Sequence, residues 1–198
     1  MLKQMLGLLL AVVLGVGGAW LVMGTGWLST GDKKSHLPLP TGGDFTLQSA
    51  DGAVNLADFR GKVVVLYFGY TACPDICPTS MATLKAAMAL LTPVEVAKVQ
   101  GLFVSVDPER DTLAHIQQYV RYFHPSLVGV SGAQAALQEI TRRYGVFYRK
   151  VEVPGSAMAY TIDHSAVLYV LDKQGKLQEQ VQHAVPPAEL AAAIRRWL

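Results

Sequence analysis

The sequence predicts an α/β domain, with one sheet packed on both faces, that follows a single N-terminal transmembrane helix. Two observations predict the domain: apolar strand-like runs alternate with helical patterns, and the last two strands are followed by a final helix. A third observation predicts the transmembrane helix. Residues 5–28 carry no charge and 17 of these 24 residues are apolar, which is enough to span a bilayer as a helix. The whole chain has 198 residues, which suits one domain plus this segment.

The N-terminal segment divides into a predicted membrane anchor, residues 1–28, and a predicted tether, residues 29–43. Trp20 and Trp27 lie toward the far end of the apolar run, where aromatic side chains commonly meet the membrane interface. A cleaved signal peptide is the alternative, but its apolar region is typically about 7–15 residues long, and no clear A-x-A site follows here. The tether is rich in Ser, Gly, Pro and Lys, as is typical of a linker.

The net charge of +2 arises at the borders of this N-terminal segment. Of 17 basic and 15 acidic residues in the chain, 14 of each kind fall within residues 36–198. A neutral body without a basic stripe argues against nucleic acid as a partner. Because Lys3 lies on one side of the apolar run, and Lys33 and Lys34 lie on the other, the positive-inside rule does not fix the orientation in the membrane.

The body of the protein, residues 44–198, begins with a predicted β-hairpin whose turn signal is Asp51-Gly52. A continuous apolar run then predicts a strand covered on both faces, and apolar residues at helical spacing predict a helix that begins near Pro78. A second buried strand follows. These predicted elements cover residues 45–47, 54–56, 63–68, 78–91 and 102–106.

The second half of the body contains three further predicted helices and four predicted strands. Gly145 closes one helix, a turn over residues 172–175 joins the last two strands, and Pro186 and Pro187 precede the final helix. In chain order, these elements cover residues 112–123 (helix), 127–130 (strand), 133–144 (helix), 146–151, 166–171 and 177–182 (strands) and 188–198 (helix).

This order of elements resembles the thioredoxin fold with an added N-terminal β-hairpin and an inserted helix. A body of this size buries a sizeable core without cross-links, so the chain's two cysteines are not needed for folding. Two cysteines are also too few for a multi-disulfide scaffold or a four-cysteine zinc site. We therefore expect the two cysteines to carry chemistry.

Cys73 and Cys77 lie in a C-x₃-C segment directly after the strand predicted over residues 63–68. Ligands of open α/β sheets bind beyond the carboxyl ends of the strands, which is where this segment lies. Because Pro78 lacks a backbone donor, we expect both cysteines in a loop or a single turn, with the regular helix starting near Pro78. The helix dipole then favours the thiolate over the thiol.

Three chemistries remain open for two thiols placed in this way. They could close an internal disulfide, exchange disulfides with a client protein, or hold a soft metal such as Cu(I), which favours thiolate and imidazole ligands. The spacing differs from the C-x-x-C of thioredoxin-like redox proteins, which shifts weight from thiol exchange toward metal binding.

Two thiolates are too few ligands to complete a metal site, so a histidine is the expected third ligand. His164 is the best candidate, because it stands just before the strand predicted over residues 166–171, and in a thioredoxin-like fold that segment faces the cysteine loop. Asp163 and Ser165 are possible partners that would fix its tautomer. The other histidines are more simply interpreted as solvated or surface side chains: His36, His115, His124 and His183.

Three charged residues, Asp107, Arg110 and Asp111, follow the strand predicted over residues 102–106. They form either a solvated turn that caps the next helix or a polar shell near the site. Met158 could reach the site as a weak thioether ligand, although filling gaps is the commoner role of methionine.

Three motifs appear in order along the chain: GYTACPDICP at residues 69–78, SVDPERDT at residues 105–112 and DHS at residues 163–165. Together they resemble the Sco/SenC family of membrane-tethered, thioredoxin-fold copper-binding proteins, which are used in assembling cytochrome c oxidase. The resemblance runs from about Phe45 to the C-terminus. One departure is Ala72, where the family often has a histidine that is not one of its ligands.

The resemblance implies that Cys73, Cys77 and His164 bind a copper ion, and we expect Asp107 and Asp163 in the shell around them. It implies a metallochaperone, not an enzyme, that delivers copper to the binuclear copper site of cytochrome c oxidase subunit II. A copper donor and a thiol reductant are further implied partners.

The resemblance also implies a single-pass protein of the cell inner membrane, with its domain in the periplasm or an equivalent compartment. The alternative is a thiol–disulfide reductase that uses Cys73 and Cys77 as a redox pair to keep the oxidase's copper-site cysteines reduced.

Overall fold

The computed structural model describes residues 40–198, so the predicted anchor and most of the predicted tether lie outside the described residues. Within residues 40–198, no helix has the length and apolar character needed to cross a membrane. The last residues of the predicted tether pack on the domain: Gly42 is buried, and its backbone N–H donates to the carbonyl of Arg143.

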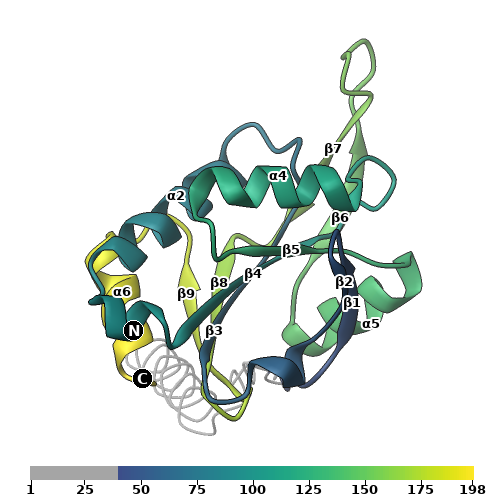
Figure 1. Cartoon of the computed structure of the whole chain (residues 1–198). Helices are drawn as coiled ribbons and strands as arrows, with labels where there is room; N and C mark the ends of the chain where they lie inside the picture. The colour runs from purple at the N-terminus through teal and green to yellow at the C-terminus, as the bar shows by residue number, and fades with distance from the viewer. Residues whose placement is uncertain (1–39) are drawn as a thin grey trace, which may run out of the picture. The chain divides into compact units, whose positions relative to one another are not determined.

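A five-stranded mixed sheet of order β5-β4-β3-β8-β9 forms the centre of the domain (Figure 1). The central strand β3 pairs parallel with β4 and antiparallel with β8. Every residue of β3 and β4 is buried, which is why β3 and the Leu102–Val104 part of β4 appear in the sequence as apolar runs. The strands are β3 (Val63–Gly69), β4 (Val99–Ser105), β5 (Val128–Val130), β8 (Val167–Leu171) and β9 (Leu177–Gln182).

Strand β4 begins three residues before its predicted start, at Val99. The added segment includes Gln100, a polar residue that is 7% exposed. Its side-chain amide donates to the carbonyls of Gly101 and Ser126 at 3.0 and 2.8 Å, and these bonds offset the cost of burying it.

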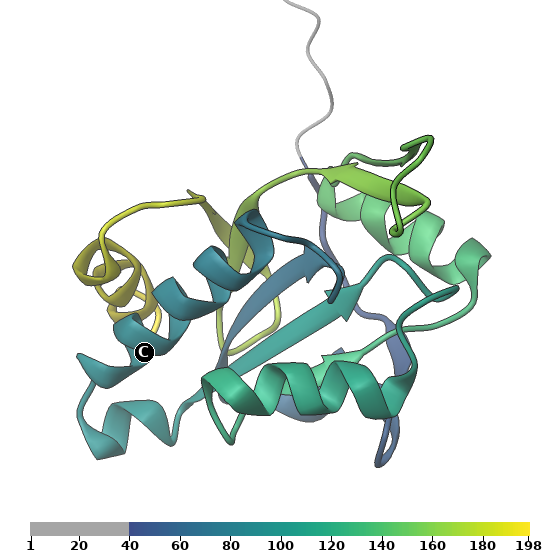
Figure 2. The same ribbon diagram turned by 90° about the horizontal axis from the view of Figure 1, so that it is seen from above.

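Helices cover both faces of the sheet, as predicted (Figure 2). Helix α2 contacts both α4 and α6, and Tyr119 of α4 packs on Phe103 of the sheet. On the opposite face, Tyr144 of α5 packs against Phe68 and Tyr169. The helices are α2 (Ile76–Ala89), α4 (Leu113–Phe123), α5 (Gln134–Tyr144) and α6 (Pro187–Arg195).

The predicted N-terminal hairpin is present as β1 (Thr46–Ser49) and β2 (Gly52–Asn55), and it bridges to the main sheet region through Gln48 and Ser131. Two short helices were not predicted, the 3₁₀ helix η1 (Leu56–Phe59) and α3 (Pro93–Val96). The signal for α3 is a capping box, in which Thr92 and Glu95 each bond the other's backbone N–H.

Helix α2 begins at Ile76, two residues before the predicted start at Pro78. The start is near the predicted position, with Pro78 as the third helical residue, because the first N–H groups of a helix have no partner within the helix. The missing N–H of proline therefore costs nothing there. Consequently Cys77 lies in the first turn of α2, while Cys73 remains in the preceding loop.

A separate two-stranded sheet projects from the domain as a hairpin of β6 (Tyr148–Glu152) and β7 (Tyr160–His164) (Figure 1). Strand β6 corresponds to a predicted strand, but β7 was not predicted. His164 is therefore the last residue of β7, paired with Tyr148, and Ser165 and Ala166 join it directly to β8.

Candidate metal centre

Cys73, Cys77 and His164 each direct one potential ligand atom to a common point, and these atoms lie within 4.8 Å of one another. Cys77 Sγ is 3.3 Å from Nε2 of His164. The group lies beyond the carboxyl end of β3, where ligands bind in open α/β sheets. The structure thus brings together the three residues singled out in the sequence.

The cysteine segment is shaped by backbone contacts that bring both sulfur atoms to one side. The N–H of Cys73 donates to the carbonyl of Tyr70, and the N–H of Cys77 points at Cys73 Sγ at 3.4 Å. Cys77 is fully buried, whereas Cys73 is half-buried. A Cβ atom on Gly69 would lie only 2.8 Å from Cys77 Sγ, so the close approach of this thiol to β3 requires glycine.

The two thiols differ in their acid–base properties. The pKa of Cys73 is lowered to about 3, chiefly by the hydrogen bond from the Cys77 thiol. Burial opposes this shift, whereas hydrogen bonds from the His164 ring and from the backbone N–H groups of Cys77 and Asp75 add to it. Burial, followed by the neighbouring Cys73 sulfur, raises the pKa of Cys77. The metal-free pair therefore holds one thiolate, on the half-exposed Cys73, and one thiol, on the buried Cys77.

The imidazole of His164 is held by a backbone carbonyl and two aromatic rings. Nδ1 lies 3.1 Å from the carbonyl oxygen of Ser165. When Nδ1–H donates this bond, the lone pair is on Nε2, which faces Cys77. The rings of Tyr67 and Tyr70 meet the imidazole edge-on at centroid distances of 6.1 and 5.8 Å. The ring is thus oriented so that the Nε2 lone pair, which can bind a metal ion, faces the sulfur atoms.

Asp163 and Ser165 do not orient His164 through their side chains. The Asp163 carboxylate is exposed and pairs with Arg149 at 2.9 Å, while the Ser165 hydroxyl accepts the N–H of Phe147. The contact to the imidazole comes from the main chain of Ser165. Met158 lies in the loop of the β6–β7 hairpin with a side chain that is 39% exposed.

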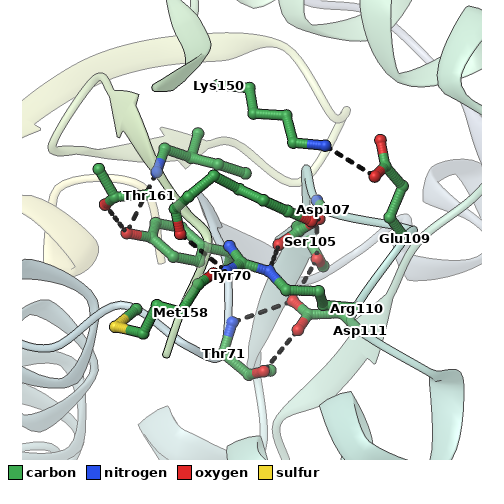
Figure 3. A network of polar contacts seen from close by, with 12 residues as sticks. Tyr70, Thr71, Ser105, Asp107, Glu109, Arg110, Asp111, Lys150, Met158 and Thr161 are labelled. Carbon is green, nitrogen blue, oxygen red and sulfur yellow. Dashed lines mark hydrogen bonds and ion pairs between the residues drawn. The ribbon is translucent and has the colours of Figure 1, made fainter. Parts of the chain in front are cut away.

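Asp107, Arg110 and Asp111 form a network of polar contacts beside the site (Figure 3). Within residues 40–198, none of the hydrogen bonds of their side chains goes to Cys73, Cys77 or His164. Asp111 accepts the N–H of Thr71 at 2.9 Å and thereby fixes the start of the cysteine segment. Asp107 accepts Arg110 Nε at 2.5 Å and the hydroxyl of Tyr160 at 2.8 Å. These residues are thus more than a solvated turn, since Asp107 and Asp111 are 3% and 4% exposed.

Two tyrosines of this region were not singled out in the sequence. The hydroxyl of Tyr70 lies 2.8 Å from Thr161 Oγ1, and the hydroxyl of Tyr160 donates to Asp107. The available signals for Tyr70 were its place in the GYTACPDICP motif and its position two residues after a predicted strand. Nothing local distinguishes Tyr160. The remaining described histidines lie outside the group: His183 approaches Ser80 and His124 approaches Ser126, and His115 is exposed.

Comparison with known proteins gives a family, several relatives and several similar structures. Residues 33–198 match the family model described as SCO1/SenC. The mitochondrial SCO2 homolog of Bos taurus is 35% identical over 190 residues, which cover 93% of this chain and 71% of that protein. The mitochondrial SCO1 homolog 1 of Arabidopsis thaliana is 40% identical over 134 residues, which cover 67% of this chain and 40% of that protein.

Among solved structures, copper-bound ScoI of Bradyrhizobium japonicum is 37% identical with a TM-score of 0.71, covering 80% of this chain and 99% of that one. The apo Sco1 protein of Thermus thermophilus is 40% identical with a TM-score of 0.67, covering 81% of this chain and 92% of that one. The predicted thioredoxin-like α/β fold is thereby confirmed. Copper is the ion held by the first of these structures, and the Cys–Cys–His group can bind it. This chain belongs to the SCO1/SenC family.

Proposed function

We propose that the protein is a membrane-tethered copper chaperone that binds copper through Cys73, Cys77 and His164. It delivers the ion to the binuclear copper site of cytochrome c oxidase subunit II. The observation that carries this proposal is the meeting of two sulfur atoms and one imidazole within 4.8 Å. Thiolate and imidazole are ligands that Cu(I) favours.

The unequal burial of the ligands suggests an order for the transfer. Cys73 and His164 are half-buried and Cys77 is fully buried, so incoming ligands from the acceptor reach copper from the Cys73–His164 side. Cys77 is then the last ligand to be exchanged. Loading releases the proton of the Cys77 thiol, because cysteine binds metals as the thiolate.

The proposal includes a membrane location and further partners. The apolar run of residues 5–28 anchors the protein in the cell inner membrane, with the domain in the periplasm or an equivalent compartment. A copper donor loads the site, and a thiol reductant keeps Cys73 and Cys77 as the dithiol. A disulfide between them removes both sulfur ligands and switches copper binding off.

The pKa of Cys73 is lowered and that of Cys77 is raised. This difference favours a second candidate function, a thiol–disulfide reductase acting on the oxidase's copper-site cysteines. The Cys73 thiolate attacks the client disulfide to form a mixed disulfide, and one client sulfur leaves as a thiolate. The Cys77 sulfur, after losing its proton, then attacks Cys73, releasing the client dithiol. The protein ends as the Cys73–Cys77 disulfide, and the thiol reductant returns two electrons.

Replacement of the native gene by single variants separates the two functions, because only copper delivery needs the imidazole. If the protein acts as a copper chaperone, His164→Ala and Cys73→Ser reduce cytochrome c oxidase activity equally. If the protein acts as a thiol–disulfide reductase, His164→Ala retains cytochrome c oxidase activity and Cys73→Ser loses it. His183→Ala is the matched control, since this half-buried histidine contacts Ser80 at 3.3 Å and lies outside the ligand group.

A further inference from the structure

Tyr160 begins strand β7, four residues before His164, and is held on three sides by charged groups. Its side chain is 8% exposed, and its hydroxyl donates to Asp107 Oδ1 at 2.8 Å. Its ring lies between two cations, with Arg110 Cζ 3.6 Å and Lys150 Nζ 3.8 Å from the ring centroid. Burial and the neighbouring carboxylate raise the pKa of Tyr160 to about 12, so the hydroxyl stays protonated and donates.

The same group of residues also holds the main chain of β7. Arg110 Nη1 donates to the carbonyl of Tyr160 at 2.9 Å and to the carbonyl of Met158 at 3.3 Å, while its Nε pairs with Asp107. Lys150 pairs with Glu109 at 2.8 Å. Figure 3 shows Asp107, Arg110 and Lys150 with their polar contacts, including the pair of Lys150 with Glu109. We call Asp107, Arg110, Lys150 and Tyr160 the hairpin anchor.

The hairpin needs such an anchor because, among residues 40–198, β7 pairs only with β6, in a sheet separate from the five-stranded one. An isolated two-stranded hairpin is marginally stable at best. Side-chain contacts therefore fix the hairpin to the domain: those of the hairpin anchor, and those of Tyr70 with Thr161 and Ile162. Because His164 is the last residue of β7, these contacts set its place relative to Cys77.

We propose that Tyr160 is a positioning residue for His164, acting through the hairpin anchor and not as a ligand. The hydrogen bond to Asp107 and the two cation–π contacts fix the start of β7, and the strand carries this constraint along four residues to the imidazole. This inference rests on the proposed function, since it assumes that His164 binds copper together with the two cysteines.

Tyr160→Phe tests the proposal most cleanly, because it removes the hydroxyl and leaves the ring between its two cations. Tyr144→Phe is the matched control: Tyr144 is also buried, its hydroxyl donates to the carbonyl of Gly43 at 3.0 Å, and it lies on the far face of the sheet. Copper(I) affinity of the reduced full-length chain is measured by competition with a chelator. We expect Tyr160→Phe to lower it about tenfold, as is usual for residues that orient metal ligands, and Tyr144→Phe to leave it within about twofold.

A double-mutant cycle with His164→Ala shows whether the effect passes through the histidine. In the His164→Ala protein, Tyr160→Phe then changes copper affinity by less than about twofold, because no imidazole remains to be positioned. An equal loss in both backgrounds would overturn the proposal, and so would an unchanged affinity for Tyr160→Phe in the native chain. Asp107→Asn, which weakens the same hydrogen bond, provides a second variant with the same expected pattern.

The outcomes also separate this inference from the proposed function. If the native chain binds no copper, or if His164→Ala binds it as tightly as the native chain, the proposed ligand set fails. If His164→Ala weakens binding as expected and Tyr160→Phe does not, only the role of Tyr160 fails.

Discussion

Cys77 Sγ and His164 Nε2 lie 3.3 Å apart, although the two residues are separated by 87 positions in the sequence. Cys77 belongs to the first turn of α2, which packs on the main sheet, and His164 ends a strand of the separate hairpin. The site therefore exists only while these two parts of the domain hold their relative position. A substitution that shifts either part is expected to weaken copper binding.

Cys73 and Cys77 are predicted to differ in reactivity in the reduced, metal-free protein. Cys73 is half-buried and its pKa is lowered to about 3, so it is a thiolate throughout the range from about pH 5 to about pH 8. We expect iodoacetamide to modify Cys73 at a rate that is flat over this range, and to leave Cys77 unmodified. Peptide mapping by mass spectrometry measures both rates. A Cys73 rate that rises about tenfold per pH unit, as for a cysteine with an ordinary pKa, would contradict this account.

Gly69→Ala is predicted to displace the Cys77 sulfur. The added Cβ would lie 2.8 Å from Cys77 Sγ and 2.9 Å from Cε1 of the Tyr67 ring. Overpacking of this kind typically costs about 1–3 kcal/mol of folding free energy, and here it also moves a ligand. We expect a lower melting temperature, measured by thermal denaturation, and a loss of copper affinity of about tenfold or more, measured by chelator competition.

Gly101→Ala is the control for this variant, because its added Cβ would also collide with a side chain, that of Leu127, but away from the ligands. We expect Gly101→Ala to lower the melting temperature and to keep native copper affinity. If both glycine variants lose copper affinity in proportion to their lost stability, Gly69 has no specific role at the site.

How much of the fold could be predicted depended on burial. Strand β3 is covered on both faces, so its sequence is an almost continuous apolar run that can be identified without a partner. Strand β4 is also fully buried, but only its apolar part from Leu102 onward was identified, because Gln100 interrupts the run. Strand β7 (YTIDH) is short and mixes buried with exposed residues, and it is stable only beside β6 and the hairpin anchor. Tyr160, Thr161 and Ile162 favour a strand and alternate in burial, but a run of three such residues is too short to identify a strand from the sequence alone.

Asp111 joins the cysteine segment to the end of β4, and its amide variant is predicted to be less stable. The buried carboxylate accepts the N–H and the hydroxyl of Thr71 and the hydroxyl of Ser105. Asp111→Asn replaces an acceptor oxygen by an amide donor, and we expect it to lower the free energy of unfolding by about 2–3 kcal/mol. Urea denaturation of the metal-free protein measures this change.

Asp51→Asn is the matched control for Asp111→Asn, because the Asp51 carboxylate is 78% exposed and lies 3.8 Å from Arg121. Exposed pairs of this kind contribute little to stability, so we expect a change below about 0.5 kcal/mol. Equal effects of the two substitutions would show that the bonds to Thr71 and Ser105 do not stabilise the fold.

The candidate ligands could be predicted from the sequence because their types and order are distinctive, whereas the residues that support them could not. Cys73 and Cys77 form a recognisable motif, and His164 has a defined place before a late strand. Tyr160 acts through Asp107 and Arg110, which lie about 50 positions earlier in the chain, and such a contact appears only when the hairpin is placed in space.

X-ray absorption spectroscopy of the copper(I)-loaded, reduced full-length chain tests the central claim most directly, because it counts the atoms bound to the metal. With one copper per chain, we expect two sulfur ligands and one imidazole nitrogen. His164→Ala should remove the nitrogen contribution, and Cys73→Ser or Cys77→Ser should each remove one sulfur. A spectrum that His164→Ala leaves unchanged would contradict the assignment of Cys73, Cys77 and His164 as the copper site.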